Sequence, residues 1–130
     1  MHETHHLAHE PASVAVARHR LRDALEGAGV GESVVYDATL VLSELVSNAV
    51  QHGRPTSRGH LEVSWTLTGD RLVLEVFDGG QATTLVPRPR DVESDRGRGL
   101  AIVDDMTAQW RVDRLGDSTH VVAELTLAMA

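Results

Sequence analysis

The sequence predicts an α+β domain of two layers, in which a mixed, mostly antiparallel sheet carries helices on one face. Apolar residues recur at helical spacing through the first half of the chain and alternate with polar residues through much of the second half. Helices followed by a run of strands are typical of this fold class. With 130 residues and 42% apolar content, the chain has the size and composition of one domain with one core.

Two helices are predicted in the first half. The first spans Pro11–Gly27, and its proline suits the first helical turn. The second spans Glu32–His52, and Gly53 is a natural stop. Residues 1–10 precede the helices as a polar tail or an edge strand, so a single domain is assigned to residues 11–130.

Four strands are predicted in the second half, where apolar and polar residues alternate. They span His60–Leu67, Leu72–Asp78, Gln109–Arg114 and Thr119–Leu127. A tight connection between the first two predicts a β-hairpin. Residues 79–98 show little periodicity, and a loop of this length in a compact domain is usually functional or disordered. A short helix is predicted to follow over Leu100–Thr107.

Charge and composition narrow the function. The formal net charge of -7 disfavours a non-specific nucleic-acid binder, which needs a basic surface. The sequence shows no apolar run of membrane length and no start of the signal-peptide type, so we expect no membrane contact and a cytoplasmic location. The absence of cysteine excludes disulfides and thiolate metal sites. A metal site among the N-terminal histidines would need a convergent geometry that the sequence does not indicate.

The second predicted helix carries an unusual set of polar residues. Glu44, Asn48 and His52 are spaced four apart and therefore form one line along the helix, beside an apolar stripe that can be buried. A carboxylate such as Glu44 can accept a proton, and the amide oxygen of Asn48 is a hard ligand suited to Mg²⁺. We interpret His52 as the helix end, where a cation complements the helix dipole.

Two glycine segments add the elements of a nucleotide site. Asp78 ends a predicted strand, and Gly79 and Gly80 after it allow a flat ring to approach the backbone. The Asp78 carboxylate can accept a hydrogen bond from the exocyclic amine of adenine. Gly97-Arg98-Gly99 precedes the short predicted helix, whose free N–H groups and dipole can bind an anion. Each segment alone is common, but their order and setting together predict a nucleotide site.

Taken together, these segments resemble the histidine-kinase-type ATPases, the GHKL group with the Bergerat ATP-binding fold. The N box would be Glu44-Leu45-Val46-Ser47-Asn48-Ala49-Val50-Gln51-His52-Gly53, and the Gly boxes would be Asp78-Gly79-Gly80 and Gly97-Arg98-Gly99-Leu100. Within the group, the chain is most similar to small stand-alone actinobacterial proteins related to anti-sigma-factor serine/threonine kinases. The resemblance covers about Pro11–Leu127, and the N box is its most specific part.

The resemblance implies a mixed sheet covered on one side by three helices, with ATP and Mg²⁺ bound. Asn48 would ligate Mg²⁺, and Glu44 would be the general base that deprotonates a serine or threonine of a partner. Asp78 would bind the adenine amino group, Gly80 would let the ring pack, and Thr119 would assist at adenine through water.

Residues 79–98 would form a lid over ATP. The phosphate contacts that the resemblance implies are Gly97, Gly99 and the N–H of Leu100, with Arg96 or Arg98 reaching the γ-phosphate from the lid.

The implied function is that of an ATP-binding regulatory protein. It would be a serine/threonine kinase of the anti-sigma-factor type that phosphorylates an antagonist protein in a partner-switching pathway. Its partners would be a sigma factor, that antagonist and, in a homodimer, a second copy of the chain. The alternative is a non-catalytic switch in which ATP controls protein binding. A structural domain without a ligand would leave the joint presence of the three segments unexplained.

Overall fold

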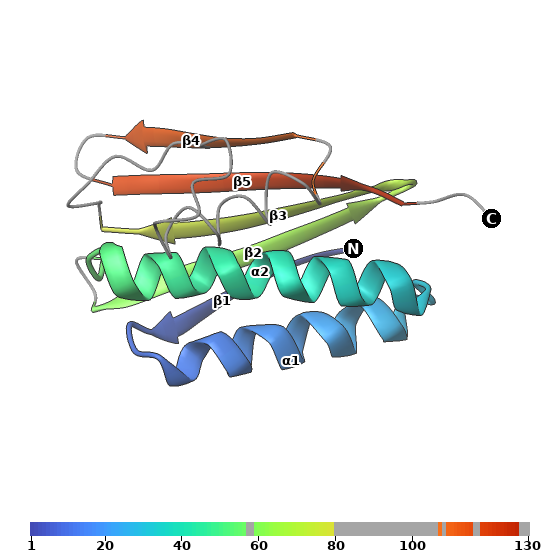
Figure 1. Ribbon diagram of the computed structural model, residues 1–130, viewed down its shortest axis with the longest axis horizontal. Coiled ribbons are helices and arrows are strands. Elements are labelled where there is room, and N and C mark those ends of the chain that lie inside the picture. Colours follow the sequence, from blue (N-terminus) through green and yellow to red (C-terminus); the bar gives the residue numbers. More distant parts are fainter. Residues whose placement is uncertain (57–58, 80–106, 108, 116–117, 128–130) are drawn as a thin grey trace, which may run out of the picture.

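The computed structural model describes residues 1–56, 59–79, 107, 109–115 and 118–127, and it has two layers (Figure 1). The elements are β1 (His2–Ala8), α1 (Ala12–Gly27), α2 (Glu32–His52), β2 (His60–Thr68), β3 (Arg71–Asp78), β4 (Gln109–Leu115) and β5 (Ser118–Thr126). This arrangement confirms the α+β class. Both helices and all four strands predicted from the sequence are present, with ends that differ by one residue at most.

The sheet has the order β1-β2-β3-β5-β4, and each pairing between described strands is antiparallel. β2 and β3 form the expected hairpin. Its two-residue turn contains Gly69 with a φ of 58°, a conformation that glycine adopts easily and that tight hairpin turns require. β1 pairs with β2 along its whole length, so the N-terminal residues form an edge strand of the sheet.

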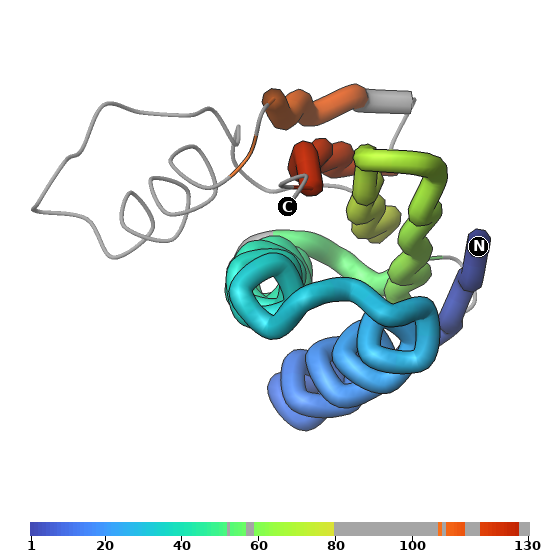
Figure 2. Tube along the Cα trace, turned by 90° about the vertical axis from the view of Figure 1, so that its right-hand side faces the viewer, coloured from blue at the N-terminus to red at the C-terminus, as the bar shows by residue number. Residues whose placement is uncertain are grey.

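Both helices lie on the same face of the sheet, side by side (Figures 1 and 2). α1 packs near the edge strand β1, whereas α2 crosses the centre of the sheet and contacts β3. Neither helix is long and apolar enough to span a membrane. The central position of α2 brings the predicted N box against the strand that ends in Asp78.

An aliphatic core fills the space between the layers. Leu21 and Leu25 of α1 and Leu42 and Val46 of α2 are fully buried. They face the inward side of the strands, which carries Leu61, Val63, Trp65, Leu72, Leu74, Val76, Val121, Ala123 and Leu125. Strand residues of alternate parity point to the other face, as the period of two requires. Because the helix-facing side of the sheet is buried and apolar, any polar side chain on it needs a specific explanation.

The expected third helix over Leu100–Thr107 and the expected lid over residues 79–98 lie outside the described residues, apart from Gly79 and Thr107. Both elements stay predictions.

Two residues of α1 test the position of the core. Leu21→Ala removes a fully buried side chain and is expected to lower the free energy of unfolding by about 2–5 kcal/mol. Val16→Ala on the same helix removes a side chain that is 38% exposed and is expected to change it by about 0.5 kcal/mol or less. Urea unfolding of both variants measures the difference, and equal losses would contradict this placement of α1.

Candidate functional site

The polar line of α2 lies at the border of the core. Asn48 is only 7% exposed, and Glu44 one turn earlier is half-buried. The Nδ2 atom of Asn48 is buried and has no hydrogen-bond partner among the described residues. A buried polar atom without a partner costs free energy, and native structures rarely keep one without a reason. A ligand at this side of α2 would supply that reason.

α2 ends against the end of β3. A Cβ atom added to Gly53 would lie 2.5 Å from Oδ2 of Asp78 and 2.6 Å from the carbonyl oxygen of Ala49. Gly53 itself has φ -90° and ψ -179°, an extended conformation that any residue adopts. The glycine is therefore required by the close approach of Asp78. The sequence had suggested only that it stops the helix.

Gly79 makes a second close approach at the same place. Its N–H donates to the carbonyl of Arg54 at 2.7 Å, and an added Cβ would lie 2.0 Å from the carbonyl oxygen of Pro55. From the sequence, we assigned the glycines after Asp78 to contact with a flat ring. In the structure, Gly79 contacts the chain that leaves α2 and so fixes the end of β3 to the end of α2.

Asp78 and Thr119 face each other across β3 and β5. They are 2% and 1% exposed, and they lie on the inward side of the sheet, in rows that are otherwise apolar. Directly opposed side chains on one face are close enough to act together, with Cβ atoms about 4.5–5.5 Å apart. The structure thus places Asp78 and Thr119 opposite each other, at the point where α2, the helix that carries Asn48, also ends.

Burial affects the chemistry of Glu44. Desolvation of its half-buried carboxyl group raises its pKa above the usual glutamate value. A carboxylate with a raised pKa holds a proton more strongly than a solvated one, which suits a general base. Glu44 thus combines partial burial and a raised pKa on the helix that also carries Asn48.

The other predicted ligands cannot be placed. Gly80, Arg96, Gly97, Arg98, Gly99 and Leu100 lie outside the described residues. Within the described part of the chain, no three His, Asp or Glu side chains converge as a metal site. Mg²⁺ in nucleotide sites is commonly held by one or two protein oxygens together with phosphates, so the amide oxygen of Asn48 fits that donor set.

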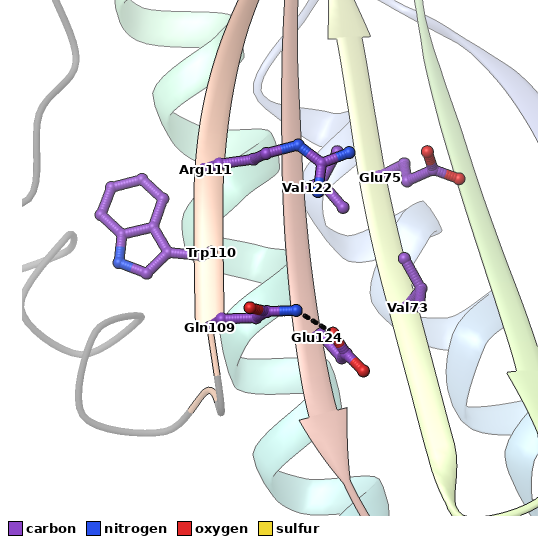
Figure 3. Close-up of a pocket in the computed structure, with 7 residues that line it drawn as sticks. All are labelled: Val73, Glu75, Gln109, Trp110, Arg111, Val122 and Glu124. Carbon is purple, nitrogen blue, oxygen red and sulfur yellow. Dashed lines mark hydrogen bonds between the residues drawn. The ribbon is translucent and has the colours of Figure 1, made fainter.

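A separate hollow of about 280 Å³ lies on the opposite face of the sheet (Figure 3). Its carboxylates are already paired within the sheet. Glu75 lies 3.0 Å from the His120 ring nitrogen, and Glu124 lies 3.2 Å from Arg71 and accepts a hydrogen bond from Gln109. Two carboxylates in the wall would also repel phosphate. We therefore assign no nucleotide to this hollow.

Comparison with known families agrees with the site. The sequence matches the histidine kinase-like ATPase domain family over residues 7–125. The chain therefore belongs to this family of ATP-binding domains, which confirms the relationship predicted from the N box and the Gly boxes.

Solved structures with a similar fold include proteins from three different bacteria. The RsbU and RsbW domains of Rv1364c from Mycobacterium tuberculosis match with a TM-score of 0.78 and 23% identity, over 100% of this chain and 33% of that chain. The SiaB–SiaC complex from Pseudomonas aeruginosa matches with a TM-score of 0.72 and 14% identity, over 95% of this chain and 88% of that chain. The histidine kinase AdeS from Acinetobacter baumannii matches with a TM-score of 0.53 and 16% identity, over 96% and 68%.

The chain spans a third of the length of the Mycobacterium tuberculosis chain that it matches. At these identities the three matches show a common fold alone.

Gly53→Ala tests the contact between α2 and β3. The added methyl group would overlap Asp78 and the Ala49 carbonyl, so we expect the free energy of unfolding to fall by about 1–3 kcal/mol. Gly27→Ala at the end of α1 is the matched control, because its Cβ would meet nothing within 4 Å, and it is expected to be neutral or slightly stabilising. Chemical denaturation compares the two, and equal stability would show that the approach is not tight.

Glu44→Gln tests the raised pKa. Folding favours the protonated form of Glu44, so its contribution to stability is present below the usual glutamate pKa and is lost as the pH rises through the folded pKa. Glutamine has no charge to desolvate, and we expect the variant to be more stable than the wild type near neutral pH. The advantage should disappear in acid.

Thermal unfolding at a series of pH values measures this difference. Glu26→Gln, at an exposed position of α1, controls for the removal of one negative charge. A stability difference between Glu44→Gln and the wild type that stays constant with pH would contradict the assignment.

Proposed function

We propose that this chain is an ATP-dependent serine/threonine protein kinase of the anti-sigma-factor type, which binds a sigma factor and phosphorylates an antagonist protein. The observation that carries the proposal is the buried Asn48, whose Nδ2 atom has no hydrogen-bond partner among the described residues, one helical turn from the half-buried Glu44. This pair lies on the element that ends against Asp78, opposite Thr119. The family match supports ATP as the ligand.

Asp78 and Thr119 would hold the adenine. Both are buried polar residues in otherwise apolar rows, so they can read the polar edge of a base while the aliphatic neighbours contact its ring. An ionised carboxylate only accepts hydrogen bonds, which selects the amino group of adenine over the O6 of guanine. Gly80 would leave room for the ring.

Asn48 would hold Mg²⁺ through its amide oxygen, and the metal would supply positive charge at the phosphates. The proposed phosphate contacts beyond the described residues are Gly97, Gly99, Leu100 and either Arg96 or Arg98. Phosphoryl transfer depends mainly on position and on positive charge around the transferred group, which these residues would provide.

Glu44 would accept the proton of the attacking hydroxyl group on the partner. Its raised pKa favours proton uptake at the moment when the hydroxyl oxygen becomes a nucleophile. Because the acceptor hydroxyl belongs to another chain, Glu44 needs access from outside, and its partial exposure provides that access. The match to the solved SiaB–SiaC complex supports a protein partner for a domain of this fold.

A transfer assay with radiolabelled ATP and a candidate antagonist tests the proposal. Asn48→Ala should weaken Mg-ATP binding in calorimetry by about tenfold or more, since it removes a metal ligand. Glu44→Gln should leave binding within about threefold but slow transfer by about 10²–10⁴-fold. Gln51→Ala is the control on the same helix, because its side chain is exposed and donates to the hydroxyl of Ser47, and it should behave as the wild type.

Two other results would contradict the kinase proposal. No calorimetric signal with Mg-ATP in the wild type would remove the nucleotide function altogether. Normal binding with no effect of Glu44→Gln on transfer would leave the non-catalytic switch in place of the kinase.

A further inference from the structure

His9 connects the turn after β1 to the last turn of α2. Its Nε2 atom lies 2.9 Å from the carbonyl oxygen of Ala49, forty residues further along the chain, and the contact is partly buried. Ala49 directly follows Asn48. Figure 1 shows the turn between β1 and α1 at the same end of the molecule as the C-terminal end of α2.

The Ala49 carbonyl carries two hydrogen bonds. It accepts from the N–H of Gly53 at 3.0 Å, which is the last bond of the helix, and from His9. A carbonyl oxygen has two lone pairs and can satisfy both donors. Because a carbonyl can only accept, Nε2 of His9 carries the proton, either in the neutral ring or in the imidazolium. Both forms therefore make the contact, and the charged form also complements the negative end of the helix dipole.

Two hydrogen bonds hold the turn that carries His9. The carbonyl of Ala8 accepts from the N–H of Glu10 at 2.9 Å and from the hydroxyl of Ser13, which is buried. Ala8 itself ends β1, which pairs with β2. The backbone on both sides of His9 is thus held by the sheet and by the start of α1, and the ring reaches α2 from there.

The same helix turn also lies close to Asp78 of the candidate site. An added Cβ on Gly53 would lie within 2.6 Å of both the Ala49 carbonyl oxygen and Oδ2 of Asp78. Interiors packed this closely transmit displacements, because there is no free space to absorb them. A shift of Ala49 therefore moves Asn48 through the chain and alters the fit between Gly53 and Asp78.

We propose that His9 is a positioning residue of the nucleotide site: its ring N–H holds the Ala49 carbonyl and so fixes the helix turn that carries Asn48 and meets Asp78. This inference rests on the proposed function for its effect on ATP. The hydrogen bond itself also predicts a local effect on the Gly53 amide that does not depend on ATP.

Three variants test the proposal in the full chain. His9→Ala should weaken Mg-ATP binding by about 3- to 10-fold, with the net free energy of one hydrogen bond as the upper limit, and should speed amide hydrogen exchange at Gly53. His9→Gln keeps an N–H donor of similar reach and should restore most of both. His6→Ala removes a histidine of β1 that pairs with Glu62 at 2.9 Å, and it should change neither.

The outcomes separate the two proposals. If the wild type binds no ATP, the proposed function fails, and the exchange of the Gly53 amide in His9→Ala and His9→Gln still decides the role of His9. Unchanged exchange and unchanged affinity in His9→Ala would overturn the inference. So would a loss in His9→Ala that His9→Gln fails to restore, since a donor at this position is the whole of the proposed role.

Discussion

The close approach between the end of α2 and the end of β3 is the constraint on which the site depends. Gly53 lies where a methyl group would overlap the carboxylate of Asp78, and Gly79 lies where one would overlap the backbone at Pro55. Two glycines, which have no side chain, thus allow a helix and a strand to end in contact with each other. A bulkier residue at either position would push the end of α2, the helix that carries Asn48, away from the end of β3 at Asp78.

The polar groups of the site are costly to the fold. The inward side of β3 and β5 is apolar until it reaches Asp78 and Thr119. The buried residues of α2 before Asn48 are apolar except Thr39, whose hydroxyl donates to backbone carbonyls of its own helix. A helix selected only to cover a sheet would carry an apolar residue in place of Asn48, whose buried Nδ2 atom has no partner among the described residues. Departures of this kind from consistent packing tend to mark functional sites, because selection keeps them despite their cost in stability.

The sequence predicted the elements better than their contacts. Periodicity located both helices and four strands, since a residue's neighbours along the chain decide which face it buries. The polar spacing of Glu44 and Asn48 also located the site helix. The close approach of Gly53 to Asp78 could not be read in this way, because it joins residues far apart in sequence, and local rules gave Gly53 a sufficient role as a helix stop. His9 was missed for the same reason, since its partner is a backbone carbonyl, which leaves no mark on the sequence.

The distribution of charge reconciles an acidic chain with a polyanionic ligand. The formal net charge is -7, yet Glu62, Glu75 and Glu124 lie on the sheet face away from the helices and are paired with His6, His120 and Arg71. At the site end, Glu44 is half-buried with a raised pKa, so its negative charge is held less firmly than that of a solvated carboxylate. Phosphate nearby would raise that pKa further and favour the protonated acid. In the proposed reaction, the phosphates that the partner's hydroxyl would attack would therefore also assist proton uptake by Glu44. A cation held at Asn48 would oppose this increase in the pKa of Glu44.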